Sequence, residues 1–177
     1  MVIAVTDACI FIDLIELNLL HRFFQCGLNI HTTADVVHEL FRHQQRLLNS
    51  FRRKGNLTIH TLSGAEQQFI LSETFPGGLS HADRSVLLLS KKLNGAILLS
   101  GDRKLRKFAG KSSIECHGSI WIVERLVNDS LISPNDGVYC LIKLIDSNLI
   151  YTNSHEMKAE VALRISKWSS GNPLEAK

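Results

Sequence analysis

Val2-Ile3-Ala4-Val5-Thr6-Asp7, near the start of the chain, is the stretch that decides the fold. Its β-branched residues form a short apolar run of the kind found in strands that are buried on both faces of a sheet. The run ends at a carboxylate, and apolar residues at spacings of three and four then predict a helix over residues 14–24. We therefore expect a buried strand, followed by a helix, with an acidic residue at the junction.

The same alternation continues through the first two-thirds of the chain. Further strands are expected at residues 29–31, 57–62, 96–99 and 113–116, with helices at residues 33–54, 63–75, 80–93 and 103–108. Strands that alternate with helices predict an α/β fold with a mostly parallel central sheet. From residue 119 the pattern is mainly helical. We expect one α/β domain at residues 1–117 and a helical extension at residues 118–177 that packs on it.

The composition excludes several classes of protein. The 177 residues are 45% hydrophobic and 21% charged, which is typical of a folded globular chain and not of a disordered one. The longest apolar runs are far shorter than the roughly 20 residues that cross a bilayer, and no basic segment of a signal peptide precedes Val2. We therefore expect a cytoplasmic protein without a membrane partner. The four cysteines are far apart, so neither a disulfide framework nor a zinc ribbon is indicated.

Positive charge is concentrated in the middle of the chain. Residues 41–111 contain thirteen basic and four acidic residues, although the whole chain has a net charge of only +3. Such blocks are often solvated helix faces, but together they favour a surface for a polyanion such as nucleic acid. The candidate phosphate contacts are Arg42, Arg46, Arg84, Arg103 and Lys104.

Four acidic residues are expected at one edge of the sheet. Asp7 and Asp102 follow predicted strands, while Glu39 and Asp83 lie in the first turns of helices. In a parallel sheet these positions converge beyond the carboxyl ends of the strands. Clustered carboxylates repel one another unless a cation lies among them, and ligation by oxygen alone suits Mg²⁺ or Mn²⁺. Such ions can activate water for phosphodiester hydrolysis.

Each acid also has a purely structural interpretation. Asp83 could cap its helix, and Asp102 could be a turn or cap residue. Glu39 could be an exposed acid that pairs with Arg42. Asp7 is the hardest to explain in this way, because an acid directly after a buried strand needs a partner.

Four segments carry a resemblance to a known family. They are residues 5–14 (VTDACIFIDL), 33–40 (TADVVHEL), 79–83 (LSHAD) and 98–105 (LLSGDRKL). Their order and approximate spacing resemble the four motifs of PIN-domain nucleases, which include the VapC-type toxins. The resemblance covers roughly residues 1–117. It implies that Asp7, Glu39, Asp83 and Asp102 bind Mg²⁺ or Mn²⁺ and cleave RNA, and it implies a homodimer as the usual state of the family.

The resemblance leaves two functions to distinguish. The first is a metal-dependent endoribonuclease in which Asp7 and Asp102 bind the metal directly and Glu39 and Asp83 complete the shell or act through water. It could be the toxin of a pair with an antitoxin protein. The second is a catalytically silent RNA-binding or protein-interaction module with the same fold. Cys9 favours the second, because many family members have Ser or Asn there and a thiol is a weaker hydrogen-bond partner.

Overall fold

The computed structural model describes residues 1–72, 75, 77–147 and 152–169. Its centre is a five-stranded sheet made of β1 (Ile3–Thr6), β2 (Asn29–Thr33), β3 (Leu57–His60), β4 (Ile97–Leu99) and β5 (Cys116–His117). The strand order is β3-β2-β1-β4-β5, and all neighbouring strands are parallel. The expected α/β fold with a parallel sheet is therefore confirmed.

The strand order reverses at β1. From β1 the chain moves outward to β2 and β3, and then returns to place β4 on the other side of β1. Thr6 pairs with Leu99 across this reversal. A crevice opens at such a switch point, beyond the carboxyl ends of the strands, because the connections leave the two central strands in opposite directions. The residues that follow β1 and β4 therefore face one another.

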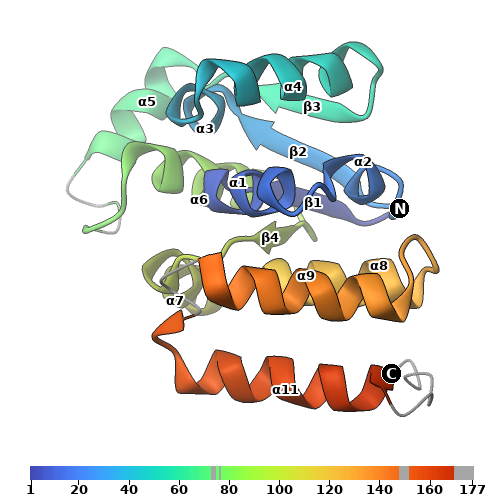
Figure 1. Ribbon diagram of the computed structural model, residues 1–177. Coiled ribbons are helices and arrows are strands. Elements are labelled where there is room, and N and C mark those ends of the chain that lie inside the picture. The colour runs from blue at the N-terminus through green and yellow to red at the C-terminus, as the bar shows by residue number, and fades with distance from the viewer. Residues whose placement is uncertain (73–74, 76, 148–151, 170–177) are drawn as a thin grey trace.

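Helices cover the sheet because its central strands are apolar and fully buried, as Val5 and Leu98 are. The helix α6 (His81–Lys92) contacts β1, β2 and β4, and α1 (Ala8–Glu16) contacts α3 (Ala34–Glu39) and α8 (Ser119–Asn128). The remaining helices are α2 (Leu20–Phe23), α4 (Arg42–Arg53), α5 (Gly64–Leu71), α7 (Arg103–Lys111), α9 (Pro134–Ser147) and α11 (His155–Ser169). In Figure 1, α4 and β3 lie at one end of the molecule and α11 lies at the other.

Two expected helices are each interrupted. The helix expected over residues 33–54 is divided into α3 and α4, because Leu40 and Phe41 adopt extended backbone conformations. Side-chain amides satisfy the backbone at this break: the Phe41 N–H donates to Gln44 Oε1 at 2.9 Å, and Gln45 Nε2 donates to the Leu40 carbonyl at 2.8 Å. The helix expected over residues 14–24 is divided into α1 and α2 around Asn18, which has a φ of 57°.

The carboxyl-terminal helices join the same hydrophobic core as the sheet. Ile122 and Leu126 of α8 and Leu141 of α9 are buried in it. The expected boundary after residue 117 stays a prediction. Residues 148–151 and 170–177 of the expected extension lie outside the described part of the chain. Residues 73 and 74 of the helix expected over 63–75 also lie outside it. Among the described helices, none is long and apolar enough to cross a membrane.

Candidate active site at the carboxyl edge of the sheet

Asp7 lies at the switch point between β1 and β4. Its N–H donates to the Leu99 carbonyl at 3.0 Å, which continues the pairing of the two strands. The side chain is only 4% exposed and caps α1, because Oδ1 accepts the Ala8 N–H at 2.6 Å. Oδ2 accepts hydrogen bonds from the Ser100 hydroxyl at 2.9 Å and from the Cys9 thiol at 3.2 Å. Both carboxylate oxygens of Asp7 are thus held in fixed positions.

Burial and a neighbouring charge oppose the ionisation of Asp7. Its pKa is raised, first by burial and then by the negative charge of Asp83, whereas hydrogen bonds from Cys9, Ser100 and Ala8 act in the other direction. Loss of hydration disfavours the charged form, and so does a nearby like charge. A cation next to Asp7 would relieve both effects.

Cys9 belongs to the same cluster. Its sulfur accepts the Gly101 N–H at 3.2 Å, in addition to its contact with Asp7, and lies 3.8 Å from the Ser100 hydroxyl. Burial, followed by the charge of Asp7, raises the thiol pKa well above its usual range. Cys9 is therefore a neutral thiol that can donate to the carboxylate. The sequence indicated a weak substitute for Ser or Asn, and the structure gives this thiol both a donor and an acceptor contact.

Ser100 connects Asp102 to Asp7. Its hydroxyl accepts the Asp102 N–H at 3.0 Å while it donates to Asp7. Asp102 also caps α7, because Oδ1 accepts the Leu105 N–H at 2.7 Å. The cap interpretation of Asp102 is thus confirmed, and Ser100 links the Asp102 backbone N–H to the Asp7 carboxylate.

Glu39 and Asp83 share a partner in Ser80. Asp83 and Ser80 form a reciprocal capping box at the start of α6, with N–O distances of 2.9 and 3.0 Å. Glu39, at the end of α3, also forms a side-chain hydrogen bond with Ser80. The Glu39 pKa is raised by burial and then by the charges of Asp7 and Asp83. In the described part of the chain, Glu39 forms no ion pair with Arg42.

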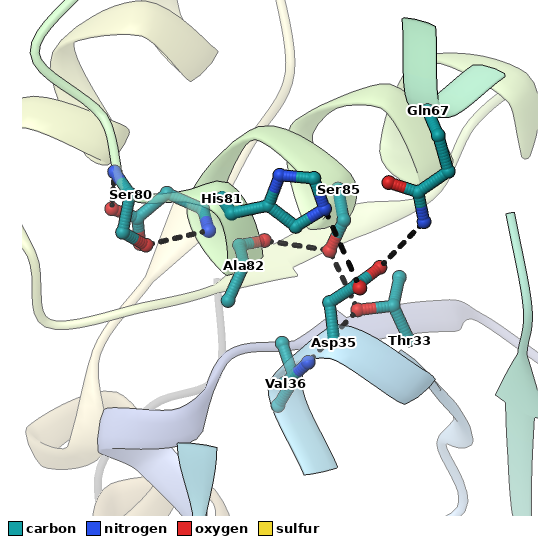
Figure 2. A network of polar contacts seen from close by, with 9 residues as sticks. Thr33, Asp35, Val36, Gln67, Ser80, His81, Ala82 and Ser85 are labelled. Atoms are coloured by element: carbon teal, nitrogen blue, oxygen red, sulfur yellow. Dashed lines mark hydrogen bonds and ion pairs between the residues drawn. The ribbon is translucent and has the colours of Figure 1, made fainter. Parts of the chain in front are cut away.

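A polar network holds α3 against α6 (Figure 2). The Thr33 hydroxyl, which caps α3, lies 2.6 Å from the Ser85 hydroxyl of α6. Asp35 Oδ1 lies 3.5 Å from His81 Nε2, and Asp35 Oδ2 accepts a long hydrogen bond of 3.5 Å from Gln67. These contacts fix the distance between the helices that carry Glu39 and Asp83. The sequence singled out neither Thr33 nor Ser85 for this role, since only the packing of α3 on α6 brings them together.

The four acids therefore form two linked pairs at one edge. Asp7 and Asp102 are joined through Ser100, Glu39 and Asp83 are joined through Ser80, and the electrostatic effects on Asp7 and Glu39 connect the pairs. Among the described residues, no three His, Cys, Asp or Glu side chains are close enough to hold a metal ion together. Hard oxygen ligands still suit Mg²⁺, which is commonly held by one or two carboxylates with water in its remaining positions. The donor set fits such an ion.

The basic candidates occupy different environments. Arg42, Arg46, Arg103 and Lys104 are exposed. Arg84 points inward instead, where its guanidinium donates to the carbonyl of Ile70 at 2.7 Å and to that of Leu79 at 3.3 Å.

Comparison with known proteins agrees with this architecture. No curated protein matches the chain significantly. A family model described as a PIN domain matches residues 3–164, which includes the whole sheet, the four acids and most of the carboxyl-terminal helices. The chain therefore belongs to the PIN-domain family, whose fold is of the nuclease type.

Proposed function

We propose that the protein is a metal-dependent endoribonuclease that hydrolyses RNA phosphodiester bonds with Mg²⁺ or Mn²⁺. The observation that carries this proposal is the environment of Asp7. A carboxylate that is almost fully buried at a sheet switch point, next to other acids, has its pKa raised by burial and by Asp83. Such a group is costly for the fold alone and useful for binding a divalent cation.

The residues divide the work according to their positions. A bound divalent ion supplies neutralising charge and a more acidic water. The proposed direct ligands are Asp7, whose carboxylate accepts from Ser100, and Asp102, whose carboxylate is held by the Leu105 N–H. Glu39 is more exposed and has a raised pKa, so it is suited to accept a proton from the attacking water. Asp83 keeps Ser80 and Glu39 in place and adds negative charge to the site.

RNA is the proposed substrate because exposed cations flank the acids. Arg42 and Arg46 extend from Glu39 along α4, while Arg103 and Lys104 begin α7 next to Asp102. Guanidinium groups suit phosphate oxygens because they can donate two parallel hydrogen bonds. We leave Arg84 out of this set, because its guanidinium already donates to two backbone carbonyls.

A catalytically silent module that binds RNA or protein is the second candidate. Cys9 favours it, because a thiol is a weaker donor to Asp7 than a hydroxyl. An antitoxin partner and a homodimer, which the family resemblance implies, also remain proposals. Co-expression of a neighbouring small gene and the mass of the protein in solution test these two partners.

Replacement of Asp7 by Asn tests the nuclease proposal. Titration with Mn²⁺ should raise the melting temperature of the original chain, because an ion that binds only the folded form stabilises it. The original chain should also cleave RNA. Asp7→Asn should lose both effects and keep its circular-dichroism spectrum. Cleavage at the original rate by Asp7→Asn would refute the assignment, whereas stable folding without any response to Mn²⁺ in the original chain would favour the silent module.

A further inference from the structure

A cavity of about 300 Å³ lies beyond β5, outside the cluster of acids. Its walls come from four elements: Arg106 of α7, His117 of β5, Trp121 of α8, and Glu160 and Arg164 of α11. None of these residues takes part in the contacts of Asp7, Glu39, Asp83 or Asp102 described above. The cavity is of the smallest size that is usual for ligand sites.

The cavity lies at the same edge of the sheet as the acids. His117 pairs with Leu99, and its carbonyl accepts the Ser100 N–H at 2.8 Å. Ser100 in turn donates to Asp7. Because β5 is two strands from β1, and neighbouring strands are spaced by about 4.8 Å, β5 is about 10 Å from the strand that precedes Asp7, and the cavity begins beyond β5. A single RNA strand that passes over the acids would reach it within a few nucleotides.

Flat aromatic surface lines one wall. The rings of His117 and Trp121 are stacked, with centroids 4.1 Å apart and an interplanar angle of 13°. The guanidinium of Arg125 also lies over the Trp121 ring, 5.6 Å from its centroid. Because Arg125 already lies over Trp121, a further ring would extend this stack on the outer side of His117, and nucleobases bind to aromatic side chains in this way.

The polar groups around the rings include both donors and an acceptor. Arg164 is fixed by Glu124, at 2.7 Å, and by the carboxylate of Glu160, at 3.0 Å. Arg106 takes part in none of the ion pairs of the described residues, so its guanidinium can bind a ligand. A phosphate alone would use only the cations of the cavity and would leave its aromatic wall and the Glu160 carboxylate without a role. A nucleobase, in contrast, presents donors and acceptors along one edge and a flat face to the rings.

We propose that this cavity binds one nucleobase of the RNA substrate and so contributes sequence preference to the cleavage. The inference rests on the proposed function, because it takes RNA as the substrate. His117 and Trp121 provide the stacking surface, Arg106 donates to the edge of the base, and Glu160 accepts from it.

Tryptophan fluorescence tests the cavity independently of cleavage. The chain contains two tryptophans, Trp121 and Trp168, so Trp168→Phe leaves Trp121 as the single reporter. In an Asp7→Asn, Trp168→Phe chain, adenosine, guanosine, cytidine and uridine monophosphates are titrated separately. At least one should change the Trp121 emission in a saturable way, whereas ribose 5-phosphate, which has no base, should not. An equal response to ribose 5-phosphate, or no saturable response to any nucleotide, would overturn the proposal.

Two neighbouring basic residues on α7 provide the comparison. Arg106→Ala should weaken nucleotide binding by roughly tenfold. Lys107→Ala removes the same charge from the neighbouring residue, which does not line the cavity. This second variant should leave binding unchanged. Equal effects would show that only general charge matters and would contradict a base site. On chains with Asp7 intact, Arg106→Ala should alter the base preference at a position a few nucleotides from the cleaved bond. Nucleotide binding without any cleavage would refute the nuclease and leave the base site standing.

Discussion

The sulfur of Cys9 affects how well the Asp7 carboxylate is held in place. The thiol donates to Asp7 Oδ2 and accepts the Gly101 N–H, so it links the residue after β1 to the turn after β4. A thiol is a poor donor by comparison with a hydroxyl. The two candidate functions of the protein therefore differ at this residue, because a carboxylate that is badly supported binds a metal ion less well.

Substitutions of Cys9 test whether its hydrogen bond to Asp7, or only its volume, matters for the site. Cys9→Ser provides a stronger donor and should match or exceed the original Mn²⁺-dependent cleavage. Cys9→Ala removes the donor and should lower cleavage or Mn²⁺ affinity by about tenfold or more. Initial cleavage rates across an Mn²⁺ titration measure both. Cys140→Ala, the same change at a core position in α9, serves as the control. If all three variants behaved alike, Cys9 would have no role in orienting Asp7.

At the scale of the elements, helix starts create the site. Asp7, Asp83 and Asp102 lie within the first turn or at the cap of α1, α6 and α7, and each binds backbone N–H groups there. Partial positive charge at a helix start favours a carboxylate at that point. A role as a helix cap is therefore compatible with a role in the proposed site. The hydrogen bonds at the start of each helix also fix the position of the carboxylate.

The cap of α6 offers a direct test of this double role. Ser80→Ala should cost about 1 kcal/mol of unfolding free energy. It should also lower cleavage, because Ser80 contacts both Asp83 and Glu39. Ser63→Ala removes an equivalent capping box from α5, at a distance from the acids, and should cost a similar free energy while leaving cleavage intact. Chemical denaturation and initial rates measure the two effects. Equal cleavage by both variants would assign Ser80 to helix stability alone.

The sequence predicted the positions of helices and strands better than the points at which one helix ends and the next begins. Periodicity identified the first four strand regions, because buried strands are dense in β-branched and aliphatic residues, whereas the segment expected at 113–116 overlaps β5 only at Cys116. It did not predict the break at Leu40 and Phe41, since both residues are apolar and fit the helical pattern, and the signal lay in the amides of Gln44 and Gln45. The positions of Asp7 and Asp102 after strands, and of Glu39 and Asp83 on helices, could be predicted, while their role in a metal site stays a prediction. The Thr33–Ser85 contact could not, because it depends on how α3 packs against α6.

At the scale of the whole molecule, a basic helix face, the cluster of acids and a cavity follow one another across the sheet. Arg42, Arg46, Asn49 and Arg53 recur at spacings of four, three and four, so they share one face of α4. A surface hollow of about 600 Å³ is lined by the last three of these residues together with Arg52. α4 starts beside α3, which carries Glu39, and leads away from it (Figure 1). This basic face of α4 and the cavity beyond β5 lie on opposite sides of the acids.

Salt dependence tests the basic face of α4 as an RNA contact. RNA binding to an Asp7→Asn chain is measured across a series of salt concentrations. Arg46→Ala should reduce the slope of log affinity against log salt by about 0.7, the value for one phosphate contact on a single strand. Arg22→Ala removes an exposed arginine from α2, outside α4 and the acid cluster, and should leave the slope unchanged. An unchanged slope for Arg46→Ala would exclude this face.

The pairing of Thr6 with Leu99 has a consequence for how the protein is made. The Ser100 hydroxyl that donates to Asp7 is translated more than ninety residues after it. A nascent chain that has not yet produced β4 lacks Asp102 and lacks Ser100, one of the hydrogen-bond partners of Asp7. The proposed nuclease would therefore gain its activity only after Ser100 and Asp102 have been synthesised and β4 has paired with β1.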